Sequence, residues 1–359
     1  MKEWKKYKLG EILTVKYGKD HKKLDAGSIP VYGSGGLMRF VNSYICDSPS
    51  ILIPRKGSLN NVMYVEHPFW TVDTMFWTII DTTIAVPRFV YYAICKIDFE
   101  SLNVGSAVPS MTVPIIEDIE IFLPSLDEQK RIVKVLSSLE SKIELNRQIN
   151  DNLEQQAQTL YKSWFVDFEP FKDSDFVESE LGLIPDGWRC GLLSELLAIK
   201  YGKDHKKLSD GDIPVYGSGG IMRYVDTKLY EGEAVLIPRK GSLNNVMYVN
   251  EPFWTVDTMF YSTVKESNSG IYSYLFLTNK DLASMNAGSA VPSMTTDILN
   301  NLQLIIPPKE VLKSFNTLCF ILFKRMKQNI IENMNLGNQR DSLLPKLMSG
   351  ELKINDLDC

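Results

Sequence analysis

The sequence predicts an α/β (α+β) protein in which two repeated mixed α/β domains are separated by two long helices that form an antiparallel coiled coil. Three features of the 359-residue chain support this fold class. Blocks of sequence recur letter for letter at long range. Short β-type runs mix with helical stretches inside each copy, and each copy is followed by a segment with a heptad-type apolar seam.

The long-range repeat is the feature around which the chain is organised. Arg55 recurs as Arg239, which sets the repeat distance at 184 residues (239 − 55 = 184). Five blocks return unchanged, namely KYGKDHKKL at 16–24 and 200–208, IPVYGSGG at 29–36 and 213–220, LIPRKGSLNNVMYV at 52–65 and 236–249, PFWTVDTMF at 68–76 and 252–260, and GSAVPSMT at 105–112 and 288–295. This period is far too long for a solenoid repeat, so we expect each copy to be a whole domain.

Each copy is expected to be a mixed α/β domain of about 120 residues. Val, Ile, Tyr and Phe cluster in short runs between Gly, Pro, Asn and Ser, and residues 50–65 are typical of two strands that flank a turn at Gly57–Asn61. Helical stretches are expected at Pro87–Lys96 and Ser269–Asn279. The expected boundaries are 1–124 for the first domain, 125–172 for the first long helix, 183–307 for the second domain, and 308–359 for the second long helix.

The segment from Asp127 to Phe165 contains neither Gly nor Pro, and its apolar residues step by four and three positions. These positions are Ile132, Leu136, Leu139, Ile143, Leu153, Ala157, Leu160 and Trp164. Asn146 and Asn150 interrupt the seam. Residues 310–344 repeat the pattern and the polar interruption, although Gly337 and Pro345 weaken the helix near its end.

A long helix with a narrow apolar stripe cannot bury that stripe alone, so we expect the two helices to pack on each other. Helices of equal length that run antiparallel meet at their middles, which predicts that Asn146 lies near Asn329 in a polar layer. The alternative is that both helices are core elements inside one globular body.

Composition limits the class of protein without identifying its function. The chain is 44% hydrophobic and 23% charged, as soluble globular chains are, and its net charge of −5 argues against binding nucleic acid by bulk charge alone. The five cysteines form no CxxC pair and suggest no disulfide framework. No signal peptide and no apolar run of transmembrane length is visible, so we expect a cytoplasmic protein.

Catalytic and metal-binding signatures are missing from the sequence. There is no phosphate loop, no HExxH, no G-x-S-x-G and no zinc quartet, and the chain has three histidines in all. No base histidine accompanies the serines of the GSAVPSMT block. We therefore expect no cofactor and no metal.

The identical blocks supply all the candidate DNA-binding residues except Arg39 and its counterpart Arg223. LIPRKGSLNN places two cations directly before a Gly-Ser turn and two asparagines after it. Arg can donate two hydrogen bonds to guanine, and Asn can form two hydrogen bonds with adenine. Lys and Ser can bind phosphate oxygens. The alternative is a solvated hairpin tip, but a merely solvated loop has no physical need for one particular set of side chains in both copies.

The other blocks have equally plain structural alternatives. KYGKDHKK surrounds a tyrosine with basic residues, which suits a nucleic-acid backbone but also an ordinary exposed charged loop. GSGG is either a tight turn or a loop whose bare backbone lets a ligand approach closely. The candidate DNA-binding residues are Lys16, Tyr17, Lys19, His21, Lys22, Lys23, Ser34, Arg39, Arg55, Lys56, Ser58, Asn60, Asn61, Ser106 and Ser110 in the first copy, and Lys200, Tyr201, Lys203, His205, Lys206, Lys207, Ser218, Arg223, Arg239, Lys240, Ser242, Asn244, Asn245, Ser289 and Ser293 in the second.

Several motifs give the whole chain a resemblance to a known family. Each domain opens near a Trp-x4-Leu pair, Trp4 with Leu9 and Trp188 with Leu193. The other motifs are LPSLDEQKRIVKVLSSLESKIELNRQIN at 123–150, LYKSWFVDFEPF at 160–171 and LLPKLMSGEL at 343–352. Together they resemble the specificity subunits of type I restriction–modification systems.

The resemblance implies a function. Each domain would be a target recognition domain that reads one half of a split site in double-stranded DNA, and the antiparallel helices would be the spacer between them. Two methyltransferase subunits would dock on the chain, restriction/translocase subunits would join them, and no membrane would be involved. The subunit would have no activity alone.

This sequence departs from the family in the likeness of its two domains, since family members generally read two different half-sites. We therefore expect an inverted-repeat site with an unspecified gap, its half-site centres about one helical turn, ~10 bp, apart. The alternatives are a stand-alone DNA-binding repressor or architectural protein, and an enzyme whose site is not visible in the sequence. The repressor needs no docking surface, whereas the aromatic stretch 160–171 suggests one unless it is part of the core.

Overall fold

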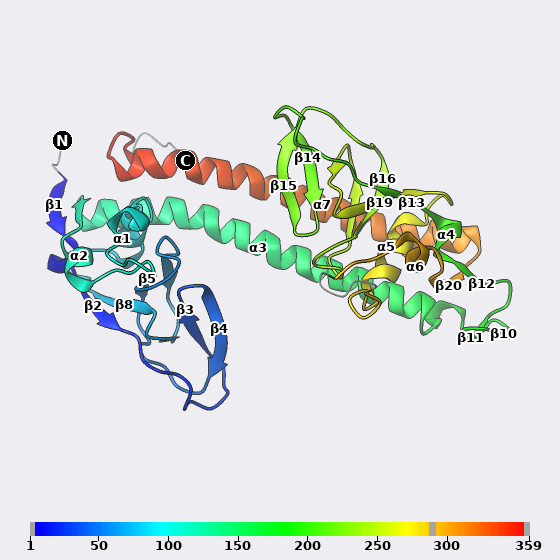
Figure 1. Ribbon diagram of the computed structural model, residues 1–359, viewed down its shortest axis with the longest axis horizontal. Coiled ribbons are helices and arrows are strands. Elements are labelled where there is room, and N and C mark those ends of the chain that lie inside the picture. The colour runs from blue at the N-terminus through cyan, green and yellow to red at the C-terminus, as the bar shows by residue number, and fades with distance from the viewer. Residues whose placement is uncertain (1–3, 287–291, 355–359) are drawn as a thin grey trace. The chain divides into compact units, whose positions relative to one another are not determined.

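A computed structural model describes residues 4–286 and 292–354 of the chain. The chain divides into two compact units, one made of residues 1–145 and 332–359 and the other of residues 146–331. Each unit contains a mixed α/β domain, half of the long helix α3 (Leu126–Phe165) and half of the long helix α7 (Lys309–Met348) (Figure 1). The expected fold class is confirmed.

The first domain is built on two small sheets. The antiparallel four-stranded sheet has the order β2-β8-β5-β6, the three-stranded sheet has the order β4-β3-β7, and β1 pairs with β9. Its strands are β1 (Lys5–Lys8), β2 (Leu13–Tyr17), β3 (Ile29–Gly33), β4 (Gly36–Val41), β5 (Ser50–Pro54), β6 (Met63–Val65), β7 (Trp70–Thr71), β8 (Met75–Ile80) and β9 (Glu120–Leu123). Its helices are η1 (Leu9–Glu11), α1 (Pro87–Ile94), η2 (Phe99–Leu102) and α2 (Val113–Glu117).

The second domain repeats this topology strand for strand. Its sheets have the orders β13-β19-β16-β17 and β15-β14-β18, and β12 pairs with β20. Its strands are β12 (Arg189–Leu192), β13 (Leu197–Tyr201), β14 (Ile213–Gly217), β15 (Gly220–Val225), β16 (Glu233–Pro238), β17 (Met247–Asn250), β18 (Trp254–Thr255), β19 (Met259–Val264) and β20 (Gln303–Ile306), with helices α4 (Leu193–Leu196), α5 (Gly270–Thr278) and α6 (Thr296–Asn300). The short helix η3 (Glu169–Phe171) and the hairpin of β10 (Phe176–Ser179) and β11 (Gly182–Pro185) precede it.

Strand β5 shows why the central strands are mainly apolar. All five of its residues are buried. Ile51 and Ile53 belong to the main core, which includes Phe89 of α1, whereas Leu52 belongs to a second cluster with Phe69 and Met75. Successive side chains of a strand point to opposite faces, so a strand covered on both faces is apolar at most positions. The polar exception, Ser50, donates its hydroxyl to the carbonyl oxygen of Thr78 at 2.8 Å. Strands β5 and β6 flank the turn at residues 57–61, as the sequence predicts.

The two half-helices run antiparallel inside each unit. In the first unit, Ile132 and Leu136 of α3 share a core with Leu347 of α7, and Asn333 of α7 donates a hydrogen bond to the carbonyl oxygen of Ile143 at 3.3 Å. Residue numbers therefore rise along α3 as they fall along α7. The seam residues are buried because the two helices pack on each other and on the domain.

The second unit shows the same direction and the central polar layer. Asn150 donates to the carbonyl oxygen of Met326 at 3.2 Å, which is the bond made by Asn333 and Ile143 repeated 183 residues away. Asn329 donates to the side-chain oxygen of Asn150 at 2.8 Å and is 1% exposed. Asn146, one helical turn before Asn150, is completely buried as well.

Helix α7 ends at Met348, beyond the end at residue 344 that the sequence pattern predicts, and Pro345 lies inside it. Proline cannot donate a backbone hydrogen bond in a helix, which costs about 3 kcal/mol in a helix interior. Leu347 is completely buried in the first unit's core, and Leu343 and Leu344 pack against that core. This burial offsets the cost of the proline and extends the helix.

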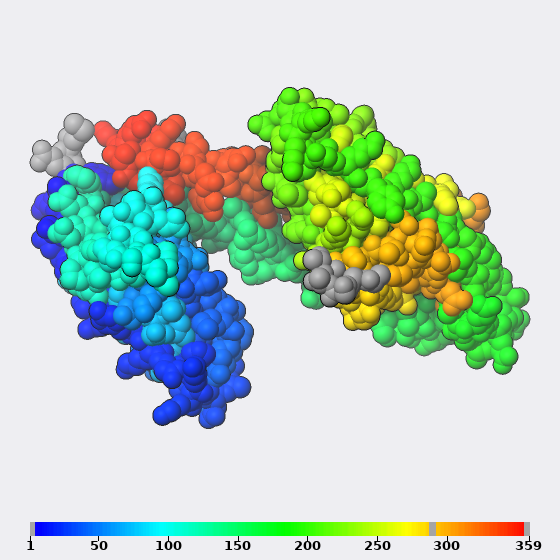
Figure 2. All heavy atoms as spheres, viewed as in Figure 1, coloured from blue at the N-terminus to red at the C-terminus, as the bar shows by residue number. Residues whose placement is uncertain are grey.

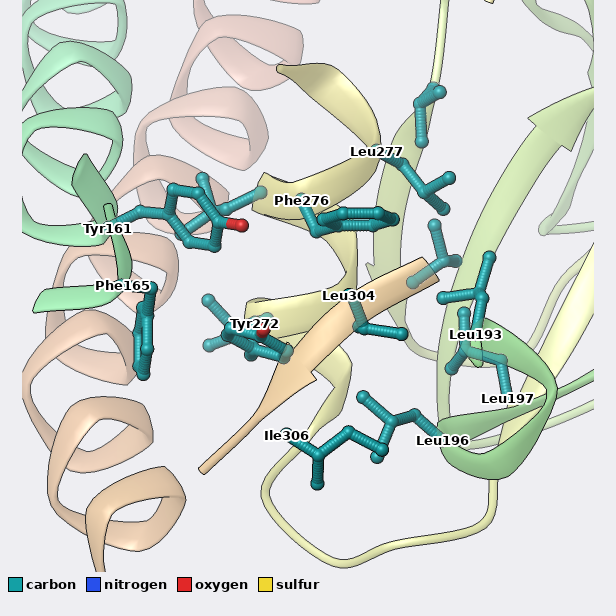
Figure 3. Close-up of a cluster of buried hydrophobic side chains, with 14 of the residues drawn as sticks. Tyr161, Phe165, Leu193, Leu196, Leu197, Tyr272, Phe276, Leu277, Leu304 and Ile306 are labelled. Carbon is teal, nitrogen blue, oxygen red and sulfur yellow. The ribbon is translucent and has the colours of Figure 1, made fainter. Parts of the chain in front are cut away.

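The aromatic stretch at 160–171 is part of the second unit's core. Tyr161, Phe165 and Phe168 are at most 8% exposed. The ring of Phe165 lies 4.7 Å from the rings of both Tyr272 and Phe315. Figure 3 shows Tyr161 and Phe165 on α3 facing Tyr272 of α5. The core alternative therefore holds for these side chains, and they are not an exposed docking surface.

In the part of the chain that the structure describes, none of the helices combines the length and the apolar character that crossing a membrane requires.

Candidate nucleic-acid interface

The turn after β5 brings three of the identical blocks together in the first domain. The backbone N–H of Gly57 donates to the carbonyl oxygen of Pro109 at 3.0 Å, and Lys56 forms an antiparallel bridge with Ser110. The side chain of Asn61 donates to the carbonyl oxygen of Ser34 at 2.8 Å. The RKGSLNN turn therefore lies between the GSGG turn and the GSAVPSMT segment.

Gly57 is required by this arrangement. Its φ is +88°, a backbone conformation that residues with a side chain rarely adopt, and a Cβ there would lie 3.0 Å from the hydroxyl oxygen of Ser34. Gly241 repeats the feature with a φ of +86° and the same 3.0 Å approach to Ser218. A glycine here keeps the two turns in contact in both domains.

Arg55 is fixed at both its backbone and its side chain. Its N–H donates to the carbonyl oxygen of Thr74 at 2.8 Å, and its carbonyl oxygen accepts from the N–H of Met111 at 2.9 Å. Nη1 of the guanidinium donates to the carbonyl oxygen of Asp73 at 3.2 Å. The guanidinium carbon lies over the ring of Tyr17, 5.3 Å from its centroid, which is within the range of a cation–π interaction.

The second domain repeats these contacts closely. Arg239 donates from Nη1 to the carbonyl oxygen of Asp257 at 3.1 Å and lies 5.4 Å from the ring centroid of Tyr201. Lys240 forms a bridge with Ser293. The two domains therefore present the same chemical group in the same local setting.

The lysines of the first block lie on the surface around this cluster. Lys16 lies in β2, whereas Lys19, Lys22 and Lys23 lie in the loop between β2 and β3, which is drawn in blue and projects at the end of the domain farthest from α3 in this view (Figure 1). Figure 2 shows the same blue segment on the molecular surface. Lys16, Lys19, Lys22, Lys23, Lys56 and their counterparts Lys200, Lys203, Lys206, Lys207 and Lys240 are all exposed. Exposed cations of this kind can bind phosphate oxygens.

An aspartate shapes each basic loop. The carboxylate of Asp20 accepts the backbone N–H of Lys22 at 3.0 Å, and this bond holds the pKa of Asp20 below its ordinary value. Asp204 and Lys206 repeat the bond at 3.1 Å, and the pKa of Asp204 is lowered for the same reason. The loops therefore have a defined local shape and an acidic group among their lysines.

Several of the candidate side chains bind within the domain. Asn60 donates to the carboxylate of Asp98 at 3.1 Å, and Arg39 donates to the carbonyl oxygen of Leu24. The matching side chains of the second domain make the same contacts. Asn244 donates to the carboxylate of Asp281 at 3.2 Å, and Arg223 donates to the carbonyl oxygen of Leu208 at 2.9 Å. Asn245, the counterpart of Asn61, donates to the carbonyl oxygen of Ser218 at 2.8 Å. These side chains hold the loops in place, and the loops in turn place Arg55 and Arg239.

The remaining candidates occupy varied positions. His21 and His205 are half-buried, whereas Ser58, Ser106 and Ser242 are exposed. Ser289 lies outside the described residues. Asp73 and Asp257 are not among the candidates inferred from the sequence. Their carbonyl oxygens orient the guanidinium groups, and the signal that pointed to them was their place in the identical PFWTVDTMF block.

Among the described residues, no group of three or more His, Cys, Asp or Glu is placed to hold a metal ion. The site in each domain consists of a guanidinium group held by a hydrogen bond, an exposed aromatic ring and exposed lysines. The fold therefore contains two copies of one domain, and the chemical groups of each loop cluster are of the kinds that suit contact with a nucleic acid.

Comparison with known proteins identifies the family. The family model described as "Type I restriction modification DNA specificity domain" matches residues 1–155 and 185–333, so the chain belongs to that family. The MjaIX specificity subunit of Methanocaldococcus jannaschii is 28% identical over 86% of this chain and 78% of its own length. The HindI specificity subunit of Haemophilus influenzae is 24% identical over 68% of this chain and 71% of its own length.

A solved structure supports the same fold. The type I restriction–modification S subunit from M. genitalium superimposes with a TM-score of 0.65 at 16% identity, and the match covers 96% of each chain. The resemblance inferred from the sequence motifs is confirmed by the family model and the curated relatives. Nothing in these comparisons favours a stand-alone repressor.

Proposed function

We propose that this chain reads a bipartite DNA site whose two halves are alike, as the specificity subunit of a multisubunit type I restriction–modification enzyme. It supplies sequence recognition and no chemistry of its own, and other subunits methylate and cut the DNA. Because its substrate is genomic DNA, it works in the cytoplasm. The observation that supports the proposal most directly is the duplicated cluster of Arg55 and Arg239 with their tyrosine and lysine neighbours.

Recognition combines two kinds of contact. The exposed lysines bind phosphates, which gives affinity without sequence information. The guanidinium groups of Arg55 and Arg239 read base edges in the major groove, where Arg pairs with guanine O6 and N7. Because both domains present the same reading group in the same setting, the two half-sites contain the same bases.

The half-sites are inverted in this proposal. The half-helices run antiparallel inside each unit, and an antiparallel helix pair has an approximate twofold axis. A protein with twofold symmetry contacts the two DNA strands in opposite directions, so its DNA site has to be a pseudo-palindrome. The half-site centres are then about one helical turn, ~10 bp, apart, with uncontacted base pairs between them.

A methylome tests this function. DNA from cells with and without the gene is sequenced with detection of methylated bases, and the motif that disappears with the gene is compared with its reverse complement. We expect a gapped, near-palindromic motif. A motif with two unrelated halves, or one uninterrupted block, would contradict the inverted-repeat proposal, and the absence of any gene-dependent motif would contradict the function.

Two methyltransferase subunits dock on the chain in this proposal, and restriction/translocase subunits join them. In the second unit, helix α7 presents three apolar side chains to solvent, Leu318, Phe320 and Ile321, which are 46%, 46% and 65% exposed. An exposed apolar group on a helix marks a site of protein association more often than an isolated apolar residue does. The three side chains therefore support a docking surface on α7.

Copurification with the methyltransferase subunit tests the docking surface. Ile321→Glu places a carboxylate among the apolar side chains and is expected to reduce the recovered methyltransferase subunit at least about tenfold, since burying an unpaired charge is costly. Gln328→Glu adds the same charge at another exposed position of α7 in the same unit and should have no effect. Equal recovery with both variants would place the docking surface elsewhere.

A further inference from the structure

We propose that Tyr17 and Tyr201 are positioning residues for DNA recognition, each holding the guanidinium of its neighbouring arginine so that the free edge of that group reads a guanine. This inference rests on the proposed function and deepens it. It names the residue that orients the base-reading group and the base that each recognition domain selects.

The arginine side chain leaves one edge for the DNA. Nη1 of Arg55 donates to the carbonyl oxygen of Asp73, so the edge formed by Nε and Nη2 points away from this anchor. Two parallel N–H groups on one edge of a guanidinium match the two acceptors, O6 and N7, of guanine in the major groove. The bond to Asp73 therefore favours recognition through the opposite edge of the fork.

Tyr17 restricts the remaining freedom of the side chain. An arginine has several rotatable bonds, and fixing them on binding costs free energy unless the free protein already holds them. The guanidinium lies over the tyrosine ring at 5.3 Å, so the ring sets its plane while the carbonyl of Asp73 sets its rotation. A planar fork that is already oriented loses less entropy when it forms two bonds to a base.

The ring of Tyr17 is itself firmly held although it is 55% exposed. It meets the ring of Phe76 edge to face, with centroids 5.1 Å apart and planes at 72°. The backbone carbonyl oxygen of Tyr17 accepts the indole N–H of Trp77 at 3.2 Å. A large aromatic ring that stays half-exposed on a fixed support gains from a partner on its face, and the partner here is Arg55.

The second domain provides an independent occurrence. Tyr201 is 53% exposed and meets Phe260 with centroids 5.1 Å apart and planes at 73°, and Arg239 lies over its ring. Other exposed positions have diverged between the copies, for example Tyr44 against Lys228. Trp77 is replaced by Tyr261 in the second domain, but the tyrosine, the arginine, the phenylalanine beneath the ring and the aspartate that anchors the guanidinium are the same in both domains. Reading the same base accounts for the retention of these four residues.

The test measures base discrimination by the full chain assembled with its methyltransferase subunit. The probes are a duplex that contains the motif found in the methylome and duplexes in which one guanine of the first half-site is replaced by 7-deazaguanine or by another base. The 7-deaza analogue lacks the N7 acceptor and keeps the base pair. The variants are Tyr17→Leu, Tyr17→Phe and Arg55→Lys, and Lys56→Ala provides the contrasting phosphate-contact pattern.

We expect wild type to discriminate against the altered guanine by roughly 5- to 150-fold, the range of one good bidentate contact. Tyr17→Leu should lose most of that discrimination and keep its affinity for random DNA and its salt dependence. Tyr17→Phe retains the aromatic ring beneath the guanidinium and should discriminate against the altered guanine like wild type. Arg55→Lys cannot donate two parallel hydrogen bonds to guanine and should lose the discrimination. Lys56→Ala should weaken binding to all sequences alike and flatten the salt dependence.

The outcomes separate this inference from the function on which it rests. If wild type bound the motif no better than random DNA, the proposed function would fail. If wild type were specific and Tyr17→Leu discriminated equally well, or lost affinity for every sequence to the same extent, the positioning role would be refuted. Should Tyr17→Leu fail to fold, Tyr201→Leu applies the same test to the second half-site.

Discussion

The polar layer of the helix pair in the second unit makes a quantitative prediction. The amide nitrogen of Asn329 donates to the side-chain oxygen of Asn150, and the amide nitrogen of Asn150 donates to the carbonyl oxygen of Met326. Asn329 is 1% exposed, so removal of its partner leaves a buried amide that water cannot solvate. An unsatisfied buried polar group of this kind costs about 1–3 kcal/mol.

We expect Asn329→Ala and Asn150→Ala each to lower the free energy of opening of the helix pair by about 1–3 kcal/mol. The double variant Asn150→Ala with Asn329→Ala removes both polar partners and should cost less than the sum of the two single effects, with a coupling energy of about 0.5–3 kcal/mol. Gln328→Ala changes a neighbouring exposed residue of α7 and should stay within about ±0.5 kcal/mol.

Hydrogen exchange of α7 peptides around residues 322–331 measures this local free energy without requiring the whole chain to unfold in one step. Urea unfolding followed by circular dichroism gives a second value for the same variants. Asparagine effects that simply add, or an Asn329→Ala effect as small as that of Gln328→Ala, would refute the idea that a polar layer couples the helices here. A coupling energy between Asn150 and Asn329 within the expected range would support the role of the polar layer in fixing the register of the two helices.

Two further predictions follow from charged groups. Arg223 forms an ion pair with Asp210 at 2.9 Å, whereas the residue that matches Asp210 in the first domain is Ala26. If Arg223 contacts a phosphate once it is freed from this pair, Asp210→Ala should strengthen DNA binding and steepen the dependence of affinity on salt concentration by up to about 1 in slope. Ala26→Asp should weaken DNA binding and flatten that dependence. Unchanged salt slopes in both would remove Arg223 from the interface. Burial raises the pKa of Glu154 above its ordinary value of 4.5, so the folded state binds more protons than the unfolded state, and the resulting stability is complete below pH 4.5 and lost as pH rises through the folded pKa. Glu154→Gln should flatten this pH dependence in denaturant titrations of the full chain, and an unaltered profile would assign it to another group.

The family and the helix pairing could be inferred from sequence because both depend on patterns that are local or repeated. The seam of α3 predicts a buried stripe from spacing alone, since residues three and four apart share one face of a helix. Identical blocks at a fixed distance predict two similar domains whatever their detailed fold. The packing of Ile132 and Leu136 with Leu347 and the bond between Asn333 and Ile143 agree with that interpretation.

The roles of the candidate side chains were less accessible to sequence reasoning. The sequence does not distinguish the roles of Asn60 and Asn61, since either side chain could form hydrogen bonds with adenine. In the structure, Asn60 donates to Asp98 and Asn61 donates to the carbonyl oxygen of Ser34, so both support the loop. Partners this distant in sequence cannot be assigned from composition or spacing, because the hydrogen-bonding capacity of a side chain does not reveal which group will satisfy it.

What the sequence determined by itself is the repeat, the two long amphipathic helices and the set of side chains placed twice at the same spacing. What only the tertiary structure decided is which of these side chains meet. Tyr17 is the last residue of β2 and Arg55 directly follows β5, and they become neighbours because both strands pair with β8, which brings the two residues to one end of the sheet. Local periodicity reports which face of an element is buried, whereas strand register is a long-range property that depends on how all the strands pack.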